Sequence, residues 1–198
     1  MILVAVATAF AAVPTAVEVL KRRTAAAPEL PRKIVHVCGG VLAAPLPYFL
    51  SYAQILVLAG LFVGVMTASR LMRVFTSLHD VGRDSYGELL FPLGIGLLAL
   101  IRPQPWAFAY ALLVLALADT AAAAIGMRSG RGRLPIGEKS IAGSAAFFVV
   151  AFAVGLPFAS VTACALVALA ATAAEGSLSR GLDNLAVPVL ACVLIGLA

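Results

Sequence analysis

Long apolar stretches separated by short polar or basic segments run along the whole chain. A helix that crosses a membrane needs about 20 mainly apolar residues, and the pattern contains about eight such stretches, several of them short. We expect spans at residues 1–20, 34–50, 53–69, 86–101, 105–126, 141–156, 158–174 and 184–198. The pattern therefore predicts an all-α, polytopic membrane helix bundle that forms a single integral-membrane domain over residues 1–198.

The second expected span contains residues that disturb helices. Gly39 and Gly40 lie near its middle, and Pro45 and Pro47 lie towards its end. Proline lacks a backbone N–H group, but a break inside a membrane is tolerated where neighbouring helices satisfy the freed backbone groups. We therefore expect this span to be broken.

The composition excludes a soluble domain. Hydrophobic residues make up 63% of the 198 residues, charged residues make up 12%, and the mean hydropathy is +1.07. An average soluble domain carries about 25% charged residues. The chain is therefore expected to be an integral protein of the cell (inner) membrane.

The basic residues predict how the chain is oriented, because Lys and Arg in short loops are retained on the cytoplasmic side. If the N-terminus is outside, thirteen of the fourteen Lys and Arg residues fall on the inner side, and Arg102 is the exception. This distribution predicts an even number of spans with both termini outside. The net charge of +5 then indicates anionic lipids or an anionic ligand at the cytoplasmic face, and no nucleic acid.

One acidic residue is expected deep in the membrane. Asp119 lies about seven residues before the inner end of the fifth span, roughly 10 Å deep at about 1.5 Å per residue. An acid at this depth indicates a functional site, although pairing with a buried Arg or capping of a broken helix is the structural alternative. Glu88, Glu175, Asp183 and Asn184 are expected at the same cytoplasmic level. Several oxygen ligands together favour a Mg²⁺ site over a proton site.

Basic residues stand at the start of two expected spans. Arg32 and Lys33 lie one helical turn before His36 in the second span, and Lys139 precedes Ser140 at the start of the sixth. Helix N-termini attract anions, and a lysine adds a point charge suited to phosphate. Both span starts are therefore candidate anion sites.

The segment GRLPIGEKSIAGS, residues 132–144, is similar to a P-loop but departs from it. Glu138 separates Gly137 from Lys139, and the apolar stretch before the segment is too long to be the strand that a P-loop follows. Gly137 and Gly143 would permit a close backbone approach, and Ser140 is a candidate N-cap. The segment is therefore interpreted as a phosphate cradle at a helix start.

Four segments together carry a family resemblance: RKIVHV, ADTAAAAIG, GEKSIAGS and EGSLSRGLDNLAVPV. In order, spacing and cytoplasmic placement they resemble the integral-membrane polyprenol kinase family, which includes phytol kinases and dolichol kinases and has CTP-dependent diacylglycerol kinase relatives. The resemblance implies a single catalytic domain that transfers the γ-phosphate of a nucleotide, often CTP, to the hydroxyl of a long isoprenoid or lipid alcohol. It also implies a divalent cation, expected to be Mg²⁺, and an active site facing the cytoplasm.

The residue patterns and the resemblance together give expected roles for individual residues. The expected catalytic residues are Asp119, Lys139 and His36; the expected nucleotide and phosphate ligands are Arg32, Lys33, Gly137, Lys139, Ser140, Gly143 and Asn184; the expected metal ligands are Asp119, Glu175 and Asp183, with Glu88 as a further candidate acid. The expected partners are the lipid alcohol, the nucleotide and membrane lipids, with a homodimer as a further option. Ala118 stands where relatives often have Gly or Ser, and the choice among CTP, UTP and ATP stays open.

Two rival functions fit parts of the pattern. A phosphatidate cytidylyltransferase also uses CTP at an inner membrane surface, but the modest size of this chain and its lack of an acid-rich C-terminal extension favour the kinase. A small ion-coupled transporter would use Asp119 to bind the coupling ion. No inverted repeat is visible, however, and the polar residues gather on one face. A purely structural membrane subunit would leave Asp119 unexplained.

Overall fold

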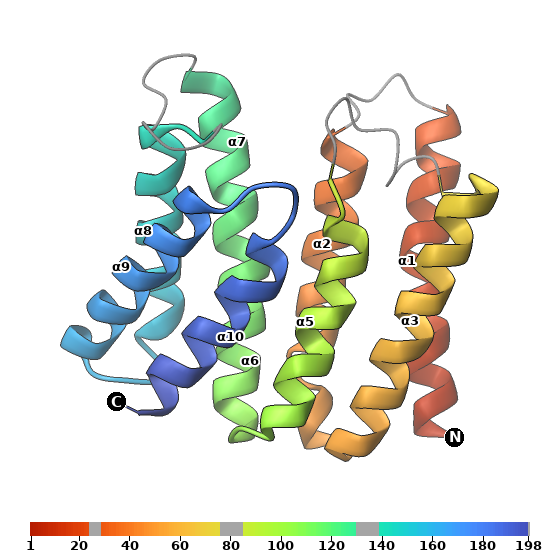
Figure 1. Ribbon diagram of the computed structural model, residues 1–198, viewed down its shortest axis with the longest axis horizontal. Coiled ribbons are helices and arrows are strands. Elements are labelled where there is room, and N and C mark those ends of the chain that lie inside the picture. The colour runs from red at the N-terminus through yellow and green to blue at the C-terminus, as the bar shows by residue number, and fades with distance from the viewer. Residues whose placement is uncertain (24–28, 76–84, 130–138, 198) are drawn as a thin grey trace.

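The computed structural model describes residues 1–23, 29–75, 85–129 and 139–197, and this part of the chain contains helices and no strand. The helices are α1 (Ile2–Arg23), α2 (Glu29–Ala43), α3 (Tyr52–Met72), α5 (Gly87–Ile101), α6 (Pro105–Leu113), α7 (Asp119–Ser129), α8 (Ile141–Gly155), α9 (Val161–Ser177) and α10 (Asp183–Gly196), as Figure 1 shows. The predicted all-α fold is therefore confirmed.

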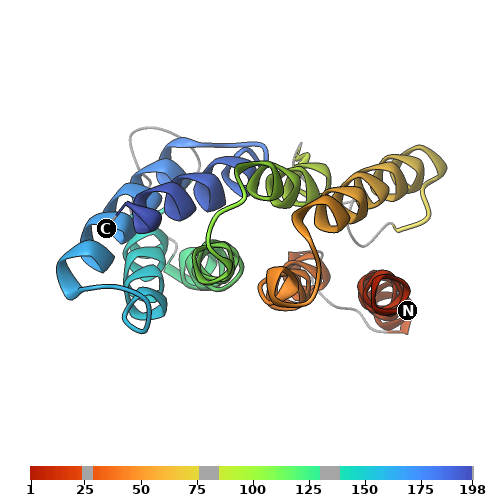
Figure 2. The same ribbon diagram turned by 90° about the horizontal axis from the view of Figure 1, so that it is seen from below.

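The helices form two layers. Seen along the bundle in Figure 2, one layer holds α1, α2, the α6–α7 helix and α8, and the other holds α3, α5, α10 and α9. Neighbours within and between the layers pack closely, including α3 on α5, α7 on α8 and α10 on both α5 and α9. The α6–α7 helix lies near the middle, and the side chains from Ala107 to Leu112 on α6 are all buried. The α6–α7 helix positions Asp119, the first residue of α7.

The expected spans can be compared with the helices directly. Each of the eight stretches predicted from the sequence overlaps a helix, and most ends differ by a few residues. The stretch 34–50 is the exception, because α2 begins five residues earlier and ends seven residues earlier. Three helices in the described part are long and apolar enough to cross a membrane: Ile2–Arg23, Tyr52–Met72 and Pro105–Ser129. The helices α5, α8, α9 and α10 are apolar but shorter. Eight crossings therefore stay a prediction.

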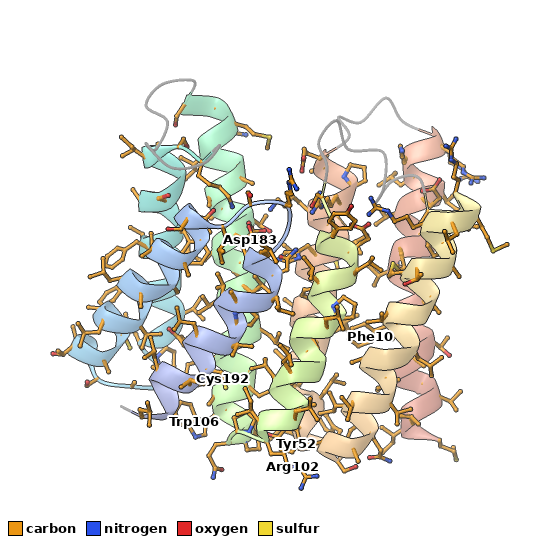
Figure 3. The ribbon with its side chains drawn as sticks, viewed as in Figure 1. Phe10, Tyr52, Arg102, Trp106, Asp183 and Cys192 are labelled. Carbon is orange, nitrogen blue, oxygen red and sulfur yellow. The ribbon has the colours of Figure 1, made fainter. Side chains whose placement is uncertain are left out.

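The two ends of the chain lie at the same end of the bundle (Figure 1). Arg102 and Trp106 also lie at this end, and Asp183 lies towards the opposite one (Figure 3). An even number of crossings would give this arrangement. The outer location of both termini stays a prediction.

Local sequence explains where the second span stops. The helix α2 ends at Ala43, and a short 3₁₀ turn follows at Leu46–Tyr48. Pro45 and Pro47 cannot donate the N–H groups that would continue the α-helix. The break that these prolines predict therefore occurs, and the chain turns here from one layer into the other.

Small residues let α2 approach the central helix. A Cβ atom on Gly40 would collide with the side chain of Ala116 and lie 3.4 Å from the carbonyl oxygen of Leu112. Ala116 belongs to a π-helical turn, Val114–Ala118, that joins α6 to α7. Such turns are rare and are frequently found at functional sites. Asp119 follows this turn directly, so the close approach brings α2 next to Asp119.

Candidate active site

Three buried carboxylates meet where α7, α9 and α10 converge. Asp119 begins α7, Glu175 lies in the last turn of α9 and Asp183 begins α10. One carboxylate oxygen from each residue lies within 4.8 Å of the others. The exposed fractions of Asp119, Glu175 and Asp183 are 8%, 1% and 8%. We call these three residues the acid cluster.

The turn between α9 and α10 holds two of these acids in place. Arg180 and Gly181 in this turn both adopt positive φ angles, 56° and 89°, a region that glycine enters without steric cost. The carbonyl oxygen of Arg180 accepts a hydrogen bond from the backbone N–H of Tyr86 at 3.0 Å. A Cβ atom on Gly181 would lie 2.6 Å from the backbone nitrogen of Gly87. The turn is therefore anchored against the start of α5.

Two lysines from distant parts of the chain pair with the three carboxylates of the acid cluster and offset part of their negative charge. The Nζ atom of Lys139 lies 2.6 Å from Glu175 Oε1 and 2.9 Å from Asp183 Oδ2. The Nζ atom of Lys33 lies 2.5 Å from Asp119 Oδ2. Burial lowers the pKa of Lys139, but Asp183, Glu175 and Asp119 outweigh burial and hold that pKa above its usual value. Lys139 is therefore positively charged at neutral pH.

His36 lies beside the acid cluster. Its Nε2 atom is 3.5 Å from Asp119 Oδ2 and 3.4 Å from the carbonyl oxygen of Leu115. The ring also packs on Phe91, with 5.0 Å between the ring centroids. The imidazole is thus held between the central helix and α5.

An apolar groove runs from His36 between α1, α2, α3 and α5. Its empty space is about 910 Å³, a volume that includes the part open to the outside. Its lining comprises Phe10, Val13, Pro14, Arg32, Val35, His36, Gly39, Leu46, Ile55, Leu58, Ala59, Phe62, Met66, Gly87, Glu88, Phe91, Pro92, Ile95 and Asn184. Phe10 lies about midway along the bundle in Figure 3. The few polar lining residues gather at the end near Asp183, so the groove is apolar along its length and polar at one end.

Two faces of α2 connect the groove with the acid cluster. Arg32, Val35, His36 and Gly39 all line the groove, and their spacing places them on one helical face. Lys33 lies on the neighbouring face and reaches Asp119. His36 contacts both regions, so α2 joins an apolar groove to a charged centre.

A second polar group lies at the polar end of the groove. The Nη1 atom of Arg70 is 2.5 Å from Glu88 Oε1, and its guanidinium lies 4.6 Å from the centre of the Tyr86 ring. Arg32 donates from Nη2 to Ser85 Oγ at 2.7 Å. Glu88 therefore pairs with Arg70. Its expected depth in the membrane had suggested that it would lie with Glu175 and Asp183, but it is not part of the acid cluster.

Sequence reasoning did not single out Arg70, Ser85 or Tyr86. Arg70 had been counted as a topology determinant, which is the ordinary role of an arginine at the inner end of a span. Its partner Glu88 is contributed by a different helix, and no local pattern in the sequence reports that contact.

Other expected phosphate ligands take different places. Ser140 is the N-cap of α8, and its Oγ accepts a hydrogen bond from the N–H of Gly143 at 3.0 Å. A Cβ atom on Gly143 would lie 2.8 Å from the carbonyl oxygen of Ala122. The close approach that Gly143 permits is therefore that of α8 to α7. Gly137 lies outside the described residues.

Asn184 bridges the α10 start to α5. Its Nδ2 atom donates to the carbonyl oxygen of Gly87 at 3.3 Å, and its own N–H donates to Asp183 Oδ1 at 3.1 Å. Asn184 also lines the groove. It therefore stands between the acid cluster and the groove.

The acid cluster has the chemistry of a divalent cation site. Its ligands are carboxylate oxygens, which Mg²⁺ prefers. Glu175 Oε2 is buried and has no hydrogen-bond partner in the described part of the chain, although buried carboxylate oxygens are normally satisfied. An oxygen of this kind, next to two other acids, fits a cation ligand.

An apolar helical bundle with a charged centre beside an apolar groove is typical of an integral membrane protein with a buried polar site. The chain is 33% identical over 199 residues to a phytol kinase from Synechocystis sp., an alignment that covers 92% of this chain and 85% of the relative. No family model matches the chain, and no solved structure matches it. The chain belongs to the phytol/polyprenol kinase-like family.

Proposed function

We propose that this protein transfers the γ-phosphoryl group of a nucleoside triphosphate to the hydroxyl of a long isoprenoid alcohol, phytol or a similar polyprenol. CTP is the proposed donor, and the proposed reaction site is the cytoplasmic face of the inner membrane. The observation that carries the proposal is the position of His36, which lines the apolar groove and lies 3.5 Å from Asp119 of the acid cluster. The relative named phytol kinase supports the acceptor class.

The groove suits the acceptor. An isoprenoid tail that enters from the bilayer gains van der Waals contacts with a lining that matches it in polarity, and the lining from Phe10 to Ile95 is almost wholly apolar. The single hydroxyl would lie at the polar end, where His36 and Asn184 line the groove. The tail thus fixes which atom of the acceptor faces the acid cluster.

The acid cluster and Lys139 suit the donor. Asp119, Glu175 and Asp183 would hold Mg²⁺, which when bound neutralises charge on the β- and γ-phosphates. An ammonium group has three donors, and Lys139 uses two of them on Glu175 and Asp183. The third can donate to a phosphate oxygen, and Lys33 can serve in the same way from the Asp119 side.

His36 is the proposed general base. Its ring would accept the hydroxyl proton, and the neighbouring Asp119 carboxylate would stabilise the imidazolium that results. The 3.5 Å between His36 Nε2 and Asp119 Oδ2 permits this contact. In this arrangement Asp119, Lys139 and His36 act on the reacting groups.

Transfer of label provides the test. The purified protein in lipid nanodiscs is incubated with γ-labelled CTP, UTP or ATP and with phytol or geranylgeraniol. A labelled prenyl monophosphate with release of the nucleoside diphosphate supports the proposal, and CTP should be the best donor. Release of pyrophosphate with formation of a CDP-lipid from phosphatidate would identify a cytidylyltransferase. Nucleotide-independent solute uptake by proteoliposomes, without labelled lipid, would identify a transporter.

A further inference from the structure

Arg32 differs from the other cations around the site. Lys33, Lys139 and Arg70 each form an ion pair with a carboxylate. Among the described residues, Arg32 has no carboxylate within ion-pair distance, and its hydrogen bond goes to the neutral hydroxyl of Ser85. Its Nη1 atom is buried and has no hydrogen-bond partner in the described part of the chain. A buried guanidinium nitrogen without an acceptor is costly, which indicates a missing anionic ligand.

The groove and Gly87 define where that ligand must lie. Arg32 lines the polar end of the groove together with His36 and Asn184. A Cβ atom on Gly87 would collide with Arg32 Nη2 and lie 2.6 Å from Asn184 Nδ2. The absence of a side chain at Gly87 is therefore what lets the guanidinium occupy the groove end. A ligand here must combine an apolar tail with an anionic head.

We infer that Arg32 binds the phosphate of the prenyl monophosphate product, with the tail still in the groove. This inference rests on the proposed function, because it assigns the same groove to the acceptor alcohol. It gives Arg32 a different partner from the nucleotide phosphate expected from the sequence. Arginine suits this role, because its planar fork can bind two phosphate oxygens at once.

The inference has a kinetic consequence. A product that keeps its tail contacts and gains an ionic contact binds more tightly than the alcohol, so it competes with fresh acceptor. We expect the prenyl monophosphate to inhibit competitively against the alcohol, with an affinity about tenfold or more above that of the alcohol. A reaction that consumes the prenyl monophosphate must therefore follow for turnover to continue.

The test measures binding without nucleotide. Purified protein in phosphatidylcholine nanodiscs is titrated with labelled geranylgeranyl monophosphate and, separately, with labelled geranylgeraniol. Arg32→Gln should lower the affinity for the monophosphate about tenfold or more and leave alcohol binding unchanged. Arg32→Lys should give an intermediate loss, since it keeps the charge and loses the fork. Arg102→Gln, at the opposite end of the bundle (Figure 3), should bind both ligands as the unmodified protein does.

If Arg32→Gln does not fold, it will also lose alcohol binding, and a second variant is then needed for the test. Gly87→Ala keeps the charge and displaces the ends of the Arg32 and Asn184 side chains, and it should weaken monophosphate binding more than alcohol binding. Unchanged monophosphate affinity in both variants would overturn the inference. So would displacement of the labelled monophosphate by phosphatidate that is as effective as displacement by unlabelled monophosphate. If the unmodified protein binds neither alcohol nor monophosphate, the proposed function itself fails.

Discussion

Lys33 and Asp119 form a close ion pair between α2 and α7, with Nζ 2.5 Å from Oδ2, although 86 positions separate them in the sequence. Both side chains are largely buried, with 13% and 11% of their surface exposed. A buried pair of this kind stabilises little by itself, but removing one partner leaves an uncompensated charge. The pair therefore fixes the position of α2 relative to the acid cluster.

The first prediction concerns Asp119. Asp119→Asn keeps the size of the side chain and removes the charge that faces Lys33 and His36. We expect turnover of a prenol to fall by about 10² or more, the scale seen when a group that stabilises transition-state charge is lost. Glu18→Gln, a buried acid on α1 that pairs with Arg22, is the matched control and should keep normal turnover. Near-normal turnover of Asp119→Asn would remove Asp119 from the mechanism.

The second prediction concerns Lys139 and Mg²⁺. Lys139→Gln leaves Glu175 and Asp183 as unpaired buried carboxylates, which should destabilise the protein by about 3–5 kcal/mol. Because a bound cation would replace the lost positive charge, Mg²⁺ should raise the unfolding temperature of this variant more than that of the unmodified protein. Thermal unfolding with Mg²⁺ and with EDTA checks this, with Lys21→Gln as the control. Equal Mg²⁺ effects on all three proteins would argue against a cation at the acid cluster.

The third prediction concerns the groove. Ala59 lines it from α3, and Ala59→Phe would fill part of the space meant for the tail. We expect the KM for geranylgeraniol to rise about tenfold, since the added ring occupies space that the long tail needs, while the KM for the shorter geraniol changes less. Leu61→Phe, on the exposed side of the same helix, should change neither value. An equal effect of Ala59→Phe on both alcohols would place the tail elsewhere.

The fourth prediction concerns His36. His36→Gln should lower kcat about 10²–10⁴-fold, the usual contribution of a general base, with little change in the KM for the nucleotide. A base works in its neutral form, so the rate of the unmodified enzyme should fall as the pH drops through the pKa of His36. The residual rate of His36→Gln should not show this fall at low pH. A pH profile of the same shape in both proteins would assign the base to another group.

The sequence predicted the helices well because most are apolar stretches bounded by polar or helix-breaking residues. The break after Ala43 also followed from local rules, since Pro45 and Pro47 act on their own backbone. The Ser140 N-cap is a local feature of the same kind. Properties of this sort depend on neighbours in the sequence, and they can be read without knowing how the helices pack.

Pairwise contacts between helices could not be predicted in this way. The acids Glu88 and Glu175 were expected at the same level, but Glu88 lies with Arg70 and Glu175 lies with Lys139. The depth of a residue in the membrane follows from its distance to the end of a span. Its ion-pair partner depends on which face each helix turns to its neighbours, and the sequence pattern does not give this. The π-helical turn Val114–Ala118 also has no signature in its sequence VLALA.

The ion pairs of the acid cluster also constrain the biosynthesis of the protein. Lys33 is made before Asp119, so a positive charge is already in place when the helix that carries this acid enters the bilayer. Glu175 and Asp183 follow Lys139 in the same order along the chain. Each carboxylate thus leaves the ribosome after its counter-charge, and a nascent chain need not hold a lone negative charge within lipid while it waits for a partner.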